Sequence, residues 1–138
     1  MGGKMKIVLW LTYLMSAVFI LGETLRRGLS YFSVNATTMV EDYLCGALLL
    51  TAAILATKGS KLASKYMVAA WAYATGGMFV PFYAHLEAYL RGATFRADHI
   101  HTDVNSVILK GVIWSIALIC FIVVLRNEAK PSLIQSND

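Results

Sequence analysis

Residues 104–125 read VNSVILKGVIWSIALICFIVVL, a run in which Lys110 is the one charged residue. A helix needs about 20 mainly apolar residues to cross the hydrocarbon core of a bilayer. This run is long enough, so it predicts a membrane-spanning helix and makes a lipid bilayer the natural surroundings of the chain.

The composition of the whole chain agrees with that setting. Of its 138 residues, 58% are hydrophobic and 14% are charged, whereas a soluble domain usually carries about 25% charged residues. A soluble core of this size could not bury so much apolar surface, which excludes secreted disulfide scaffolds, soluble Rossmann-type enzymes and disordered regulators. The net charge of +4 is better explained by membrane topology than by nucleic acid, and we expect no nucleic-acid partner.

Three further stretches are long and apolar enough to span, and they cover residues 5–22, 38–57 and 66–90. The connecting segments are short, as in antiparallel helix bundles. The sequence therefore predicts one all-α membrane domain over residues 1–138, with four transmembrane helices in up-down order and a tail at 126–138.

The basic residues of the connecting segments predict the orientation. One side holds seven of them: Lys4, Lys6, Lys58, Lys61, Lys65, Arg126 and Lys130. The other side holds four: Arg26, Arg27, Arg91 and Arg96. Because basic residues favour the cytoplasmic side, both termini are predicted to be cytoplasmic. We expect a multi-pass protein of the plasma membrane, of the bacterial inner-membrane kind.

The acids and histidines gather on the opposite, outer side. Six of the eight carboxylates and all three histidines belong there: Glu23, Glu41, Asp42, Glu87, Asp98, Asp103, His85, His99 and His101. Such groups at membrane depth are costly unless they are paired or hydrated, so they usually face a bundle interior or a wet cavity. The pattern predicts a functional site at the outer face.

Roles within this site follow from residue type. Carboxylates and an imidazole close together in a low-dielectric site suit general acid–base chemistry, and the candidate catalytic residues are Glu41, Asp42, His85 and Glu87. The candidate substrate-binding residues are groups able to hold a polar or anionic head, namely Glu23, Arg27, Arg91 and Lys110. Alternatively, Glu41 and Asp42 are acids placed favourably at a helix N-terminus, and His85 is a hydrogen-bonded core histidine.

Helical spacing predicts how these side chains lie. Adjacent Glu41 and Asp42 point about 100° apart, so only one of them faces the core directly. Glu87 diverges from the histidine two residues before it and can pair with Arg91, four residues on. Lys110 can extend along its helix toward the outer acids.

Small residues and a proline predict local features of two spans. Gly46 shares a stripe with Asp42 and allows a close approach of another helix. Pro81 is expected to kink its helix and to free the carbonyl of residue 77. The glycines at 76 and 77 give that segment a thin, closely packable face.

The segment His99-Ile100-His101 suits a metal if it is extended, because alternate side chains of a strand share one side. Imidazoles with nearby carboxylates bind Zn²⁺, Cu²⁺ or nonhaem iron, so the candidate ligands are His85, His99, His101 and Asp103. The alternative is a hydrated loop in which Asp103 caps the next helix. A divalent metal is thus one cofactor the set could take, whereas haem is not expected, since only His85 lies within a predicted helix.

Two segments 64 residues apart resemble each other. Residues 23–32 and 87–95 both contain Glu-x₃-Arg-Gly-x-(Ser/Thr) and then Phe. A parallel repeat of two helical hairpins would explain the match. A generic helix exit, with a Glu–Arg pair followed by a capping glycine, would explain it equally.

Three functions remain open. The first is an outer-leaflet acid–histidine site, with or without a metal, that acts on or binds a lipid-like or small amphipathic ligand. The second is a small proton- or cation-coupled transporter or channel that works as an oligomer. The third is a non-catalytic subunit of a larger membrane complex. Membrane lipids are expected partners in each case. Walker A, His-Glu-x-x-His and Gly-x-Ser-x-Gly motifs are absent, so whether the chain is an enzyme stays open.

Overall fold

The computed structural model describes residues 2–22, 24–25, 28–93 and 104–129, and the regular structure in these parts is entirely helical. Helix α1 covers Gly3–Ala17 and continues into the π-helical turn η1, Val18–Gly22. A short 3₁₀ turn, η2 (Leu29–Tyr31), leads into α3, Phe32–Thr57. Helices α4 and α5 cover Ala63–Leu90 and Val104–Ala129.

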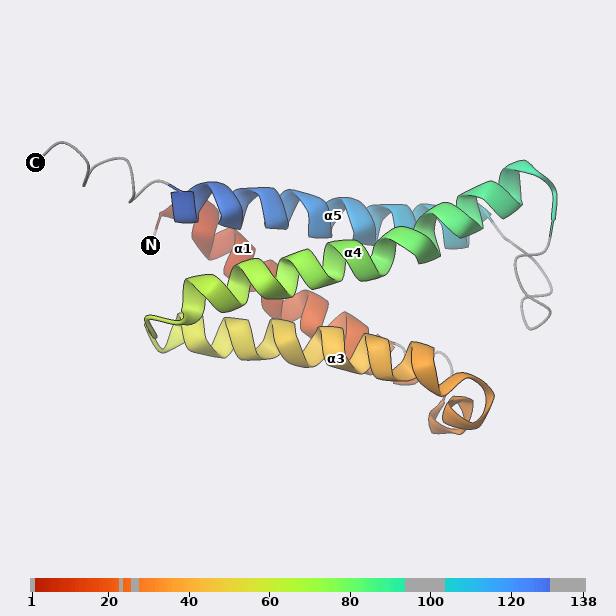
Figure 1. The fold of residues 1–138 in the computed structure, drawn as a ribbon, viewed down its shortest axis with the longest axis horizontal. Helices are drawn as coiled ribbons and strands as arrows, with labels where there is room; N and C mark the ends of the chain where they lie inside the picture. Colours follow the sequence, from red (N-terminus) through yellow and green to blue (C-terminus); the bar gives the residue numbers. More distant parts are fainter. Residues whose placement is uncertain (1, 23, 26–27, 94–103, 130–138) are drawn as a thin grey trace, which may run out of the picture.

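Neighbouring helices run antiparallel (Figure 1). The start of α1, the turn at 58–62 and the end of α5 lie at one end of the bundle, which we call the basic end because of its exposed lysines and arginine. The start of α3, the end of α4 and the start of α5 lie at the other end, the acidic end. Helix α3 packs on α4, α4 on α5, and α1 on α3.

Three of these helical segments are long and apolar enough to cross a membrane: Gly3–Gly22, Leu29–Thr57 and Val104–Glu128. They contain or overlap the predicted spans 5–22, 38–57 and 104–125. The predicted span 66–90 lies within α4, which is as long but carries glycines, tyrosines, a tryptophan, a histidine and a proline that lower its hydropathy. That α4 spans and that both termini are cytoplasmic stay predictions.

Helix α3 begins earlier than predicted and changes direction at Asn35. The backbone there has φ −151° and ψ 79°, and the Asn35 side-chain oxygen accepts a hydrogen bond from the Thr38 amide at 3.2 Å. This bond is the N-cap of the long part of α3. Glu41 and Asp42 therefore lie in the second turn after the cap, where the favourable effect of the helix dipole on acids has largely faded.

Glycines with positive φ angles follow the helix ends, as expected if each Glu–Arg segment is simply a helix end with a capping glycine. Gly92 has φ +62°, and the amides of Gly92 and Ala93 return to the carbonyls of Tyr89 and Ala88, which is the Schellman arrangement. Gly28 also has a positive φ, +74°. Glu23 and Arg27 of the first copy lie outside the described residues, so the hairpin repeat stays a prediction.

The bundle centre combines apolar packing with a buried hydrogen bond between α4 and α1. Trp71 of α4 donates its indole N–H to the Thr12 hydroxyl of α1 at 3.2 Å, and this hydroxyl donates to the Val8 carbonyl at 2.7 Å. Leu49 and Cys120 pack in the same cluster. Large apolar side chains such as Trp10, which is 77% exposed, cover the outside, as expected of a surface that faces lipid.

The predicted close approach at Gly46 is confirmed. The hydroxyl of Ser16 on α1 donates to the Gly46 carbonyl at 2.9 Å. A Cβ added at Gly46 would lie 2.5 Å from Cγ1 of Ile20 and 3.2 Å from the Ser16 carbonyl oxygen. The missing side chain is what lets α1 and α3 touch along this stripe.

We expect Gly46→Ala to destabilise the bundle by about 1–3 kcal/mol, because the new methyl group overlaps Ile20 and a backbone carbonyl. The loss should appear as a lower Tm in detergent. Gly76→Ala is the matched control, since nothing lies within 4 Å of a Cβ there. Equal Tm values for the two variants would contradict the packing.

Candidate functional site

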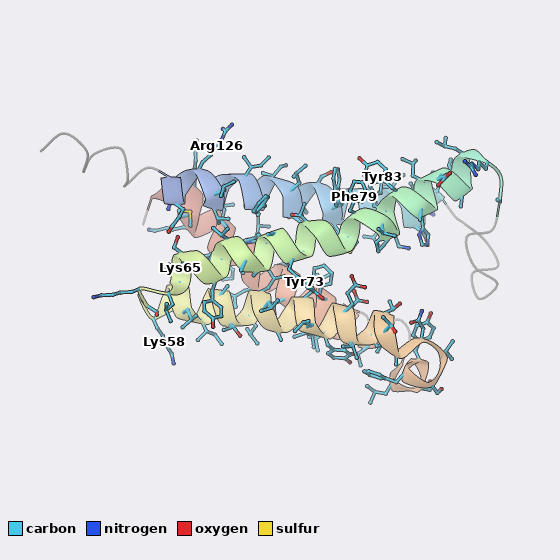
Figure 2. All side chains as sticks on the ribbon, viewed as in Figure 1. Lys58, Lys65, Tyr73, Phe79, Tyr83 and Arg126 are labelled. Atoms are coloured by element: carbon cyan, nitrogen blue, oxygen red, sulfur yellow. The ribbon has the colours of Figure 1, made fainter. Side chains whose placement is uncertain are left out.

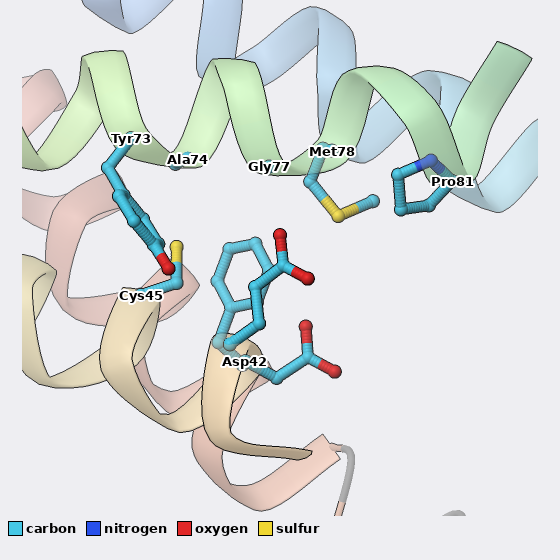
Figure 3. A pocket seen from close by; sticks show the side chains of 9 residues that line it. Asp42, Cys45, Tyr73, Ala74, Gly77, Met78 and Pro81 are labelled. Carbon is cyan, nitrogen blue, oxygen red and sulfur yellow. The ribbon is translucent and has the colours of Figure 1, made fainter. Parts of the chain in front are cut away.

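A cavity of about 20 Å³ lies between α3 and α4 toward the acidic end (Figure 3). Its volume is enough for about one water molecule. The residues that line it are Phe19, Glu41, Asp42, Cys45, Tyr73, Ala74, Gly77, Met78 and Pro81. Two predicted catalytic residues, Glu41 and Asp42, thus line one cavity together with the proline and the second of the two glycines.

Glu41 faces the backbone of α4. Its Oε1 lies 3.2 Å from the point that a Cβ at Gly77 would occupy, so the glycine gives the carboxylate room. Glu41 is half-buried. Within the described residues no hydrogen bond or ion pair joins its carboxylate to another side chain.

Asp42 lines the same cavity, and Figure 3 shows its carboxylate pointing away from α3 toward α4. Both adjacent acids thus line this cavity, and the expectation that only one of them faces the core directly stays a prediction.

Pro81 acts on this cavity through the backbone. It has no N–H, so the carbonyl of Gly77 lacks the hydrogen-bond donor that an α-helix normally supplies four residues later. Helix α4 nevertheless continues through Pro81. Gly77 and Pro81 both line the cavity, so this interruption of the helical hydrogen-bond pattern lies beside the two carboxylates.

His85 lies one turn beyond Pro81 and is buried, with 5% of its surface exposed. Its Nδ1 lies 2.8 Å from the Pro81 carbonyl oxygen, and its Nε2 lies 2.5 Å from Nζ of Lys110 on α5. A carbonyl can only accept, so Nδ1 carries the proton and Nε2 accepts from Lys110. Both ring nitrogens are engaged, so a metal ion at Nε2 would have to displace Lys110.

Glu87 and Arg91 form the predicted pair, with Oε1 and Nη2 2.6 Å apart. Their side chains are 60% and 73% exposed, so this is a surface ion pair at the acidic end, separate from the cavity. Glu87 also diverges from the buried His85, as the spacing predicts.

The other predicted site residues, namely Glu23, Arg27, His99, His101 and Asp103, lie outside the described residues. In the parts of the chain that the structure describes, no group of three or more His, Cys, Asp or Glu side chains could hold a metal ion. The proposed metal set is therefore untested at three of its four members.

The cavity includes five residues that were not among the predicted site residues: Phe19, Cys45, Tyr73, Ala74 and Met78. A signal for one of them exists, because Tyr73, Gly77 and Pro81 recur every four residues and so share one face of α4. Phe19 gave no such signal, since it lies in the π-helical turn η1, which shifts the helical register.

Comparison of the chain with protein-family models, with curated proteins and with solved structures finds no match. Its function therefore has to be argued from its own residues.

The geometry makes a testable prediction about His85. In the ¹⁵N NMR spectrum of histidine-labelled protein, Nδ1 of His85 should carry the proton and Nε2 should not, because Pro81 offers only an acceptor. The His85→Gln variant identifies the signal. Lys110→Met should shift the Nε2 resonance and leave Nδ1 protonated; a proton on Nε2 in the parent protein would contradict the arrangement.

Proposed function

We propose that the chain is an integral membrane protein with four spans and cytoplasmic termini, and that the cavity between α3 and α4 binds the primary ammonium head of a small amphipathic ligand. The observation that carries the proposal is the position of Glu41. Its carboxylate reaches into a cavity within the bundle and meets no partner among the described residues.

The charge of the site indicates a cationic ligand. A carboxylate in low-dielectric surroundings is costly unless a counter-charge or a proton accompanies it. Asp42 adds a second carboxylate to the same cavity, and the Gly77 carbonyl, which lacks a donor because Pro81 has no N–H, is a third acceptor group beside it. An ammonium group supplies three N–H donors and one positive charge, which matches this set of acceptors.

The size of the cavity limits the kind of cation. A space of about 20 Å³ accepts a group about as large as one water molecule. A primary ammonium has that size, whereas a trimethylammonium is much larger. Phe19, Ala74 and Met78 form apolar walls, which suit the first carbons of an attached chain.

An anionic head is less well supported at this place. Arg91 is paired with Glu87 on the surface, and Arg27 lies outside the described residues. Both ring nitrogens of His85 are already in contact with Pro81 and Lys110. We therefore assign Glu41 and Asp42 to ligand binding and propose no catalytic step.

Cation-coupled transport is the second candidate, and one observation favours it. Thr12 and Ser16 of α1 are buried polar residues in the bundle interior. Thr12 also contacts Met67, which lines a second cavity at the basic end. Polar groups thus lie between the two cavities, although the fully buried Trp71 fills the space beside Thr12.

Glu41→Gln should weaken the binding of dodecylammonium by about tenfold or more, because a charge-assisted contact is lost. The measurement is calorimetric titration of protein in phosphatidylcholine nanodiscs, with empty nanodiscs as the blank. Parent protein should bind dodecyltrimethylammonium and dodecyl phosphate weakly.

Glu87→Gln is the matched control for this titration, since it removes an exposed carboxylate at the same end and should leave the affinity unchanged. Equal losses of affinity in both variants would mean that the effect comes from general surface charge. This result would contradict the proposed site. Sodium or proton flux in proteoliposomes that disappears in Glu41→Gln would favour the transport candidate over binding alone.

A further inference from the structure

A second cavity, of about 260 Å³, lies at the basic end of the bundle. It is formed by the start of α1, the end of α3, the start of α4 and the end of α5. Its lining residues are Gly2, Met5, Ala56, Ala63, Ser64, Met67, Val124 and Asn127. All four helices of the bundle therefore contribute to one hollow at this end.

The cavity has an apolar floor and a polar mouth. Met5, Met67 and Val124 provide large apolar surfaces, while the small side chains of Ala56 and Ala63 leave the space open. Ser64 and Asn127 bring a hydroxyl and an amide to the same wall. An occupant that fits both parts has a polar head and an apolar continuation.

Exposed cations lie at the same end of the bundle as this cavity. The described basic residues at this end are Lys4, Lys6, Lys58, Lys61, Lys65 and Arg126, and each is exposed. None of the six is in an ion pair with a described residue. Figure 2 shows Lys58, Lys65 and Arg126 projecting at this end of the bundle.

Several of these cations are next to lining residues in the chain. Lys4 and Lys6 flank Met5, Lys65 follows Ser64, and Arg126 precedes Asn127. Glu128 is the one acidic residue among the described residues at this end, and it accepts a hydrogen bond from Ser64. The negative charge of Glu128 therefore offsets only a small part of the positive charge at this end of the bundle.

We propose that this cavity binds the headgroup of an anionic phospholipid of the phosphatidylglycerol type. The phosphate lies among the lysines at the rim, the glycerol hydroxyls meet Ser64 and Asn127, and the first methylenes contact the apolar floor. Basic pockets between membrane helices bind anionic lipid heads in this way. A volume of about 260 Å³ is slightly below the range of about 300–1,000 Å³ typical of ligand pockets, so it accepts a headgroup and not a whole lipid.

General attraction between basic residues and an anionic membrane is the competing explanation, because the positive-inside pattern arises without any pocket. The two explanations differ in which residues matter. Under general attraction, every exposed lysine contributes equally to lipid binding, and the volume of the cavity has no effect on it. Binding in a pocket depends more on Lys65, beside Ser64, than on Lys58 in the turn between α3 and α4. Such binding is lost when the cavity is filled.

The test titrates full-length protein in phosphatidylcholine nanodiscs with dioctanoyl phosphatidylglycerol and counts bound lipid by native mass spectrometry. We expect one tightly bound molecule per chain. Lys65→Gln should weaken its binding by about fivefold, Ala63→Leu should abolish it by filling the cavity, and Lys58→Gln should change it by less than twofold. If Ala63→Leu does not fold, Ala56→Leu fills the same space from α3.

Equal losses in Lys65→Gln and Lys58→Gln, or unchanged binding in a folded cavity-filling variant, would overturn the proposal in favour of general attraction. Glycerol 3-phosphate provides the second arm of the experiment. If it binds as tightly as the lipid and responds to the same variants, the site is one for a soluble phosphate, and the lipid assignment is wrong.

Discussion

The hydrogen bond from Trp71 to Thr12 joins α4 to α1 through the middle of the bundle. An apolar exterior gives helices in lipid little reason to associate, so close packing and interhelical hydrogen bonds have to hold them together. Trp71 is completely buried, and its indole N–H would be costly there without an acceptor. The hydrogen bond from Ser16 to Gly46 then joins α1 to α3.

This arrangement leaves the two ends of the bundle chemically different. At the acidic end, Glu41 and Asp42 share a water-sized space with the backbone around Gly77 and Pro81. At the basic end, small residues of α3 and α4 leave a larger hollow beneath exposed lysines. The two cavities therefore differ in their surroundings, with acids lining the first and exposed lysines at the same end of the bundle as the second.

Helical periodicity predicts the contacts that depend on one helix alone. The Glu87–Arg91 pair and the divergence of Glu87 from His85 both follow from residue spacing. Contacts between helices depend on how far one helix is displaced along another, which spacing does not encode. Spacing therefore does not predict that Lys110 meets His85 or that Thr12 accepts a hydrogen bond from Trp71.

The adjacent glycines of α4 allow the most direct test of the central claim, that the space between Glu41 and α4 is a binding site. Only Gly77 faces Glu41, whereas a Cβ at Gly76 would meet nothing within 4 Å. The measurement is the affinity for dodecylammonium in nanodiscs. The claim predicts that Gly77→Leu abolishes binding and that Gly76→Leu retains it, with both variants folded; equal affinities in the two variants would contradict it.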